Sequence, residues 1–507
     1  MTNPRTVRHR FALWCIALLL GISSAAWAQS EIRIGVPGEG DTLDPAQLSF
    51  VPSFAVSTNI YSGLVRYTPG TLDLQPDLAT AWDVSDDGLT WTFHLRDGVT
   101  WQKGYGELTA ADVVASFERV RNPETGSRWR GELSMIDTIS APDDRTVVFT
   151  LNRASAAFLH TVAVFRQGMI VNVEAATEFG DDFGRNPIGS GAYQLRQWNP
   201  GVEIVLEANP DYYEGAPSID VVRFIVIPDE NVRMLALENG ELDVAINLQN
   251  PELYRRLAAN PNIETGEITT STMHGIMLNT RAEPFDDVRV RQAVLHAIDR
   301  DIIAEVIWGG LATPAYSELA PAYLGHSEDV PRYAYDPERA RALLAEAGHP
   351  NGIRTSFYYL STHNQELLAV LRANLRDAGI EVDVQLVDGG TWVQMLGSGT
   401  VPMILTLATR ADPHIWYSNF FHSNAFSPGL NGMWYDGIDA FIDAGNATTD
   451  PDERAAIYAQ ASRQVMTDVP FIPLYWPKHA HPYWSYVEGW DGRQQYDAWM
   501  FPVSLNR

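Results

Sequence analysis

The stretch PFDDVRVRQA at residues 284–293, followed by AIDR at residues 297–300, decides the fold. A Pro-Phe pair comes before two aspartates and a run in which apolar and charged residues mix. An aspartate oxygen readily accepts hydrogen bonds from the free N–H groups of a helix N-terminus. We therefore expect a turn that leads into a helix capped by Asp286 or Asp287. Such a block specifies a backbone and does not identify a ligand.

Helices alternate with short strands on both sides of this block. Asp336-Pro337 and Asp450-Pro451 each place a capping residue before a proline at the first helical position. The stretch from Thr109 to Asp112 has the pattern of a capping box. Residues 380–386 alternate between apolar and polar side chains, as a half-buried strand does. This alternation of elements predicts an α/β fold built in layers.

The first 28 residues have the pattern of a secretory signal peptide. Three arginines precede a 12-residue apolar run from Phe11 to Ile22, and small residues follow up to Ala26-Trp27-Ala28. The run is shorter than the roughly 20 residues that span a membrane. We predict cleavage after Ala28 and export to the periplasm. Cleavage would remove three arginines and no acidic residue, which changes the net charge from −27 to −30.

Composition and motifs exclude several classes of function. A chain with 63 acidic and 36 basic residues is a poor candidate for nucleic-acid binding, which needs a basic face. The single cysteine, Cys15, lies in the signal peptide, so the mature chain has no thiol nucleophile or thiolate ligand. No phosphate-binding P-loop, G-x-S-x-G elbow or H-E-x-x-H metal motif is present. We expect no catalytic residues, no metal and no cofactor.

Ordered blocks along the mature chain resemble one family, the dipeptide, oligopeptide and nickel group of periplasmic solute-binding proteins of ABC importers (solute-binding family 5). The resemblance covers essentially the whole mature chain. Besides the block at 284–300, it rests on DTLDP at 41–45, PDLATAW at 76–82, DGLTWTFHLRDG at 87–98, TAADVVASF at 109–117, PIGSGAY at 187–193, NPDYY at 209–213 and NT at 279–280.

The resemblance implies two α/β lobes joined by two hinge strands, with the ligand between them. Lobe I would comprise residues 29–270 and 480–507, with an inserted subdomain at about 55–185, and lobe II residues 271–479. The first crossing would lie near residues 269–274. Closure of the hinge around a small organic solute would prepare the protein for the permease subunits of an ABC importer in the inner membrane. We expect it to act as a monomer.

The loop from Leu407 to His414 is where the resemblance places the anchor for a peptide amino group. Relatives that bind dipeptides carry an aspartate there, and alignment on the Asp-Pro step puts Thr409 at this position. A small shift would bring Asp412 to it instead. Arg410 then places a cation where a dipeptide binder has an anion, and its guanidinium suits a carboxylate or a phosphate. The alternatives are an ion pair within lobe II for Arg410 and a helix cap for Asp412.

Five further side chains are candidates for lining the ligand pocket. The arginine with which dipeptide binders hold the carboxylate would fall near Tyr359 or Leu360, so it is missing here. Trp392 matches a tryptophan that often lines the pocket in the family, and the other two tryptophans are expected in loops near the cleft. Aromatic walls can stack on rings, sugars or cations. Packing explains these positions equally well: Trp392, Trp416, Trp434, Tyr359 and His274.

Three functions are compatible with these observations. The first is a periplasmic binding protein that delivers a modified peptide, an opine-like conjugate or another carboxylated solute to an ABC importer. The second is an exported hydrolase on the same fold. The third is a periplasmic chaperone or sensor that presents its ligand to a receptor. The absence of a recognisable nucleophile or metal motif favours the first over the second.

Overall fold

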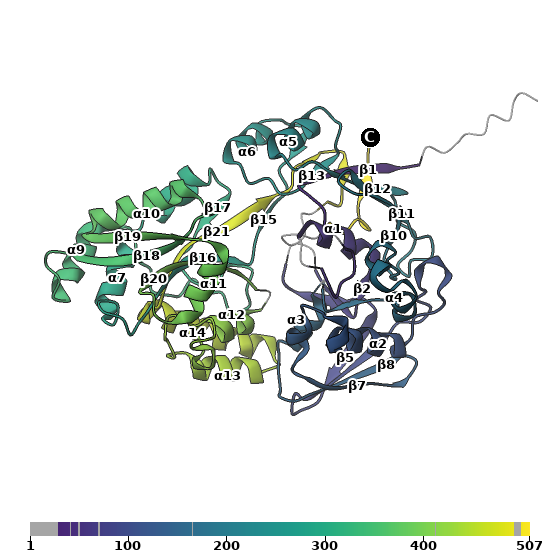
Figure 1. Ribbon diagram of the computed structural model, residues 1–507, viewed down its shortest axis with the longest axis horizontal. Helices are drawn as coiled ribbons and strands as arrows, with labels where there is room; N and C mark the ends of the chain where they lie inside the picture. The colour runs from purple at the N-terminus through teal and green to yellow at the C-terminus, as the bar shows by residue number, and fades with distance from the viewer. Residues whose placement is uncertain are drawn as a thin grey trace, which may run out of the picture.

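The computed structural model describes residues 29–507 except 41, 49–50, 69–70, 165, 411 and 491–497. The predicted signal peptide therefore lies outside the described residues. Two α/β lobes stand side by side, as expected, and the long strand β21 (Phe471–Ala480) runs between them (Figure 1). Among the described helices, none combines the length and the apolar character that a membrane span requires.

Lobe I is built on a seven-stranded mixed sheet. Its strand β1 lies in the middle and pairs in parallel with β12 on one side and β13 on the other. Apolar residues alternate along β1, so that Ile32 and Ile34 are fully buried. From edge to edge the strands are β10 (Tyr193–Asn199), β11 (Glu203–Ala208), β12 (Val221–Val226), β1 (Glu31–Val36), β13 (Val244–Ala245), β22 (Tyr483–Trp484) and β14 (Ile263–Glu264).

A second sheet of lobe I is antiparallel and four-stranded, in the order β5 (Ala79–Val84), β6 (Thr90–Leu95), β8 (Thr146–Leu151), β7 (Ile136–Asp143). Helix α2 (Ala110–Arg121) packs on it and begins with the predicted capping box of Thr109 and Asp112. The remaining elements of this region are α1 (Val51–Ile60), β2 (Ser62–Gly63), β3 (Val65–Tyr67), β4 (Leu74–Pro76), α3 (Phe158–Ala163), β9 (Met169–Ile170), α4 (Val173–Phe179) and the short helices η1 (Gln102–Gly104), η2 (Pro123–Thr125), η3 (Arg130–Leu133) and η4 (Gly180–Arg185).

Lobe II is built on a sheet whose central strands are β16 and β20. These two pair antiparallel over their whole length, so that Thr272 lies opposite Thr409 at the end nearest lobe I. The strand order is β15 (Glu267–Thr269), β21, β16 (Thr272–Leu278), β20 (Met403–Thr409), β18 (Ile353–Leu360) and β19 (Ile380–Val387), and β17 (Ala312–Pro314) pairs with β21.

Helices cover both faces of the lobe II sheet, and each face has its own apolar core. One face carries α7 (Val288–Ala297), α8 (Arg300–Ile302), the π-helical turn η5 (Ile303–Ile307), α9 (Pro337–Glu346) and α10 (Gln365–Asp377). The other carries α11 (Gly389–Ser398), α12 (Pro413–Phe420), η6 (Ser423–Ala425), α13 (Asp439–Ala447) and α14 (Pro451–Asp468).

The predicted caps in lobe II are confirmed. The carboxylates of Asp336 and Asp450 accept hydrogen bonds from the first turns of α9 and α14. Of the two aspartates in the opening block, Asp287 caps α7, and its carboxylate accepts a hydrogen bond from the N–H of Arg289 (2.8 Å). Each helix therefore begins where its sequence places a capping side chain.

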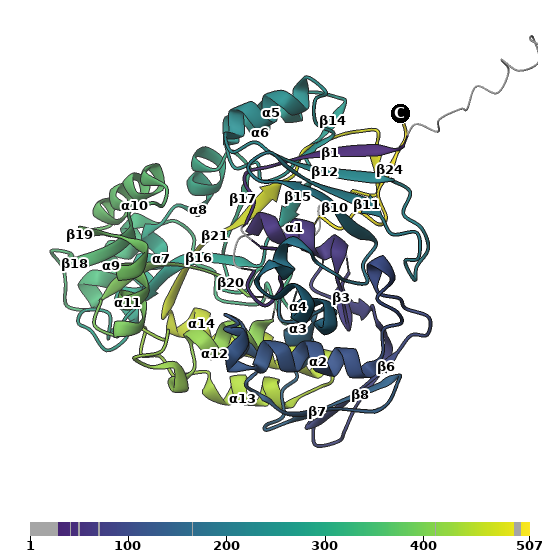
Figure 2. The ribbon, with the colours of Figure 1, turned by 45° about the vertical axis from the view of Figure 1, so that its right-hand side comes forward.

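Two antiparallel strands connect the lobes. Residues 267–269 of β15 pair with residues 478–480 of β21, and the chain enters β16 directly afterwards. Helices α5 (Glu230–Glu238) and α6 (Pro251–Ala258) lie beside these strands and bury an apolar cluster that includes Ala480 (Figure 2). The C-terminal hairpin of β23 (Val487–Glu488) and β24 (Ser504–Leu505) returns to lobe I. The lobe boundaries given above stay a prediction.

A buried carboxyl group lies in the core of lobe II. Glu318 is fully buried and accepts hydrogen bonds from the hydroxyls of Tyr417 (2.6 Å) and Ser462 (3.1 Å). Within the described part of the chain, no arginine or lysine lies within ion-pair distance of it. Burial raises the pKa of Glu318 from its ordinary value to about 7.

The raised pKa makes the stability of the protein pH-dependent in a defined direction. The folded state binds the Glu318 proton between about pH 4.5 and pH 7, whereas the unfolded state releases it. The contribution of this group to the free energy of unfolding therefore falls as the pH rises through that window, by about 3 kcal/mol in total. In Glu318→Gln this fall should disappear. Chemical denaturation at pH 5 and pH 8 measures it.

The exposed Glu338 on α9 provides a matched control, because Glu338→Gln should keep the pH profile of the unchanged protein. Parallel profiles for Glu318→Gln and the unchanged protein would contradict the assignment of this titration to Glu318.

Candidate functional site

The loop between β20 and α12 carries the two charged residues that sequence analysis selected. Arg410 follows the last residue of β20, and Asp412 is the N-cap of α12, which has Pro413 at its first position. The Asp412 carboxylate accepts a hydrogen bond from the N–H of His414 (2.7 Å). The hydroxyl of Tyr323 donates to the carbonyl of Arg410 (2.7 Å) and fixes the loop from the side.

Asp412 forms a buried, bidentate ion pair with Arg454 of α14. The two guanidinium nitrogens of Arg454 donate to the two carboxylate oxygens at 2.7 and 2.8 Å. Burial alone would raise the pKa of Asp412, but the nearby charge of Arg454 outweighs it and lowers the pKa to about 2. The carboxylate is therefore ionised and already neutralised by the protein, and the same side chain caps α12.

Lobe I reaches Asp412 through α3 and β3. The Nε2 atom of His160 lies 3.6 Å from a carboxylate oxygen of Asp412. The ring of Tyr67 lies against that of His160, with 5.9 Å between the centroids. Burial lowers the pKa of His160, and the Asp412 carboxylate acts in the opposite direction. Helices α12 and α13 accordingly lie next to α3 in both views (Figures 1 and 2).

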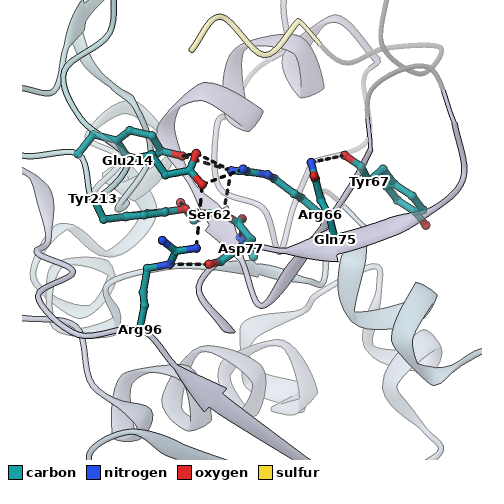
Figure 3. A network of polar contacts seen from close by, with 10 residues as sticks. Ser62, Arg66, Tyr67, Gln75, Asp77, Arg96, Tyr213 and Glu214 are labelled. Atoms are coloured by element: carbon teal, nitrogen blue, oxygen red, sulfur yellow. Dashed lines mark hydrogen bonds and ion pairs between the residues drawn. The ribbon is translucent and has the colours of Figure 1, made fainter. Parts of the chain in front are cut away.

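A polar network inside lobe I holds β3 in place. Arg66 donates to Glu214 (2.8 Å) and Asp77 (3.3 Å), and the Arg96 Nε donates to the carbonyl of Asp77 (2.7 Å). Side chains alternate along a strand. Arg66 therefore points into lobe I, while Tyr67 points the other way (Figure 3). The network thus fixes the strand that presents Tyr67 to lobe II.

A second contact between the lobes is formed by one residue of α13. Asn446 accepts hydrogen bonds from the N–H of Ala156 (2.9 Å) and the hydroxyl of Ser155 (3.1 Å). Its side-chain amide donates to the carbonyl of Ala154 (3.2 Å). Three consecutive residues of lobe I are thereby held by a single residue of lobe II, close to the pair of His160 and Asp412.

The side chain of Arg410 remains available in this arrangement. Among the described residues, no carboxylate lies within ion-pair distance of its guanidinium, which contacts the Thr409 carbonyl (2.8 Å) and the ring of Phe420. Burial lowers the pKa of Arg410 from its ordinary value, and the charge of Glu132 partly compensates. The predicted alternative for Arg410, an ion pair within lobe II, is therefore not observed.

The residues around this loop form the interlobe cluster, which joins side chains from both lobes. Sequence analysis predicted only two of its members, because the others lie outside the blocks that carry the family resemblance. In lobe I the sequence offered only a histidine, His160, with no motif around it that would mark it as part of a site. The cluster comprises Tyr67 and His160 of lobe I and Tyr323, Arg410, Asp412 and Arg454 of lobe II.

The predicted aromatic candidates lie elsewhere in lobe II. Trp416 was expected in a loop but lies within α12, fully buried against Phe420 and Phe421, because its apolar ring completes the core. Trp434 does lie in a loop, where its indole donates to the Gly399 carbonyl (2.7 Å). Gly399 precedes the start of β20, at the end opposite Thr409. Neither tryptophan joins the interlobe cluster.

The other three candidates are accounted for by packing within lobe II. The indole of Trp392 donates to the carbonyl of Leu405 (2.8 Å) in the middle of β20. Tyr359 is fully buried and donates to the carbonyl of Asn364. His274 stacks on Tyr475, and burial lowers its pKa to about 3. Their roles as pocket residues stay predictions.

Comparison with known proteins gives consistent results. The profile of the bacterial extracellular solute-binding proteins, family 5, middle region, matches residues 73–428. The glutathione-binding protein GsiB of Salmonella typhi is 30% identical over 477 residues, which cover 91% of this chain and 92% of that protein.

Two solved structures are similar over nearly their whole length. The periplasmic binding protein DppA of Helicobacter pylori, in complex with the peptide STSA, has a TM-score of 0.75 at 29% identity, covering 94% of this chain and 99% of that one. The binding protein MoaA of A. tumefaciens R10, in complex with mannopinic acid, has a TM-score of 0.73 at 30% identity, covering 95% and 100%.

A substitution can test whether Asp412 is a structural residue. In Asp412→Asn the amide still caps α12, but Arg454 loses its carboxylate and stays buried. We expect the free energy of unfolding to fall by about 3–5 kcal/mol, the usual cost of breaking a buried pair. Denaturant unfolding measures this change.

Asp388 is the matched control, because it caps α11 through hydrogen bonds and is exposed. Asp388→Asn should change the free energy of unfolding little, since asparagine caps as well as aspartate. Equal, small losses for the two variants would contradict a structural role for the pair of Asp412 and Arg454.

Proposed function

The chain belongs to the bacterial extracellular solute-binding proteins of family 5, and from this membership we propose that it captures a carboxylated, peptide-like solute between its lobes. The protein is a solute-binding component of an ABC transporter. The proposal concerns the ligand, its anchor and the partners. The ligand class is a modified peptide or an amino-acid conjugate with a free carboxylate.

One observation carries the choice of ligand. Among the described members of the interlobe cluster, the one carboxylate, Asp412, is already neutralised by Arg454, whereas Arg410 has no ion pair with a described residue. A ligand ammonium at Asp412 would have to compete with a buried bidentate pair. A ligand carboxylate at Arg410 would meet an unused guanidinium that is already partly desolvated. Thr409, at the aligned anchor position, is exposed and carries no charge.

Relatives with different ligands support this reading. Among similar proteins are binders of glutathione and of mannopinic acid, both of which are carboxylated solutes. A family that accepts such different solutes on one fold differs in the residues of its site rather than in the fold itself. In this chain Arg410 is at such a position, directly after β20.

The proposed role in transport also includes export of the protein, closure of its lobes and delivery of the solute to a permease. The precursor is exported to the periplasm and cleaved after Ala28, and the mature protein acts as a monomer. Rotation about β15 and β21 closes the lobes on the solute, and the permease subunits in the inner membrane receive it. The chain binds its solute and does not transform it.

Native mass spectrometry of the purified mature protein, followed by denaturation, identifies any solute that remains bound through purification. We expect a released species that carries a carboxylate and needs no free peptide N-terminus. Arg410→Gln should weaken its binding at least tenfold by calorimetry, because a charge-assisted hydrogen bond is lost.

The exposed Arg376 of α10 supplies the control, since Arg376→Gln should leave the affinity unchanged. An ordinary di- or oligopeptide whose affinity survives Arg410→Gln would refute the proposed anchor. If no solute is released, a thermal-shift screen of carboxylated solutes finds one, because a ligand of the folded state raises the melting temperature.

A further inference from the structure

The end of helix α13 receives one of its hydrogen-bond donors from lobe I. The last carbonyl groups of a helix have no partner within the helix. In α13 the carbonyl of Gly445 accepts a hydrogen bond from the Nε of Arg454, within lobe II (2.9 Å). The next carbonyl, that of Asn446, accepts one from the N–H of Ala156 (2.9 Å). The other lobe therefore helps to complete the end of this helix.

The side chain of Asn446 adds two further hydrogen bonds to lobe I. Its Oδ1 atom accepts from the hydroxyl of Ser155 (3.1 Å), and its Nδ2 atom donates to the carbonyl of Ala154 (3.2 Å). Ser155 is only 3% exposed, so water competes little for its hydroxyl. We call the contact of Asn446 with residues 154–156 the latch.

In lobe I the latch residues are attached to the four-stranded sheet. They come directly before α3, and the carbonyl of Ser155 accepts a hydrogen bond from the N–H of Phe158 (3.1 Å). Phe158 is fully buried, and its ring centroid lies 5.3 Å from that of Trp91 and 5.2 Å from that of Phe149. These two aromatic residues belong to β6 and β8. The latch therefore connects lobe II to this sheet.

In lobe II, Arg454 links the latch to the loop that carries Arg410. Its Nε donates to the carbonyl next to Asn446, and its other two nitrogens hold the carboxylate of Asp412. Asp412 in turn lies 3.6 Å from His160 of α3. One buried arginine thus fixes two places at which lobe II meets lobe I, so that closing the latch also sets the loop of Arg410 against lobe I.

A third contact between the lobes is apolar. Leu72 lies in the turn between β3 and β4 of lobe I and packs against the apolar cluster of lobe II that includes Trp416 and Tyr417. Figures 1 and 2 show α13 next to α3 at the end of the interlobe face away from the hinge strand β15. Displacement in a hinge rotation grows with the distance from the hinge, so a small opening separates these contacts.

We propose that the latch sets the closed fraction of the protein and the residence time of its solute, with the same effect on every solute. All groups of the latch belong to the protein, so its contribution to closure does not depend on what lies between the lobes. A factor common to all closed complexes changes every affinity by the same ratio. Asn446 is therefore a positioning residue. The inference rests on the proposed function for the closure of the lobes, but not for the carboxylate or for Arg410.

The first measurement needs no solute. The mature protein is unfolded, separated from any bound small molecule and refolded, and small-angle X-ray scattering gives its radius of gyration. Asn446→Ala and Ser155→Ala both remove hydrogen bonds between the lobes, so each should increase the radius of gyration. Gln460→Ala removes an exposed amide of α14 and should leave it unchanged. Denaturant unfolding verifies that each variant is folded.

The second measurement follows the release of solutes. The probes are glutathione, dialanine and any solute released from the purified protein, and each one that raises the melting temperature is used. Asn446→Ala should raise the dissociation rate about tenfold, because two hydrogen bonds between the lobes are lost. The association rate should not fall, since the solute enters between open lobes. Every probe should show the same ratio of affinities between the variant and the unchanged protein.

A double-variant cycle tests whether the effect crosses the interface. Ser155 belongs to lobe I and Asn446 to lobe II, and their side chains share one hydrogen bond. The combined variant should therefore raise the dissociation rate by less than the product of the two single effects. Independent effects would indicate that each substitution acts only within its own lobe, and would contradict the latch.

The remaining outcomes separate the latch from the function on which it rests. An unchanged radius of gyration or an unchanged dissociation rate in Asn446→Ala overturns the latch. A ratio that differs between probes also overturns it, because Asn446 would then contact the solute, while capture between the lobes stands. If Arg410→Gln has no effect and Asn446→Ala has the expected one, the latch stands and the carboxylate anchor falls. If no probe binds, the measurement without solute decides alone.

Discussion

The buried ion pair between Asp412 and Arg454 is the interaction on which the site depends. It ties the loop after β20 to α14, which lies almost 40 residues further along the chain, and it starts α12 at a defined place. Two consequences follow from one contact. The loop is fastened to α14 at the residue that begins α12, and the carboxylate of Asp412 is neutralised by a guanidinium of its own lobe. A buried pair of this kind adds little net stability, but removing one partner is costly, so it fixes a geometry more than it adds free energy.

In lobe I, too, one set of residues holds a strand in place and a different residue faces the other lobe. The charges of Arg66 and Arg96 compensate those of Asp77 and Glu214 inside the lobe and fix β3. The alternation of the strand then turns Tyr67 outward. In both lobes, therefore, an ion-pair network inside the lobe positions a neighbouring polar side chain. That side chain is Tyr67 in lobe I, whose hydroxyl has no partner among the described residues, and Arg410 in lobe II, which has no ion pair with a described residue. The lobes meet at His160 and at Asn446, on elements other than the hinge strands β15 and β21.

The fold was predictable because its signals are local. Capping aspartates, a proline at the first helical position and alternating strands act within a few residues, and Asp287, Asp336 and Asp450 cap helices as predicted. The site was predictable only in part. Arg410 and Asp412 stood out because their loop departs from a family pattern, but the partner of Asp412 lies on another helix, and no local signal links the two. Trp416 illustrates the opposite error: a tryptophan near a functional loop suggests a pocket wall, whereas the ring is large and apolar enough to be drawn into the core of α12.

The proposed anchor of the ligand, Arg410, is positively charged, whereas the protein as a whole is strongly negative. The chain has a formal net charge of −27, and at physiological salt the interactions of its exposed charges are largely screened beyond about 8 Å. The guanidinium of Arg410 is partly buried and lies near the ring of Phe420, so its field is screened less. A local field between low-dielectric walls can oppose the field of the whole molecule. An acidic protein can therefore present a cationic group between its lobes, and the carboxylate proposed for the solute follows from the partly buried guanidinium of Arg410 rather than from the total charge.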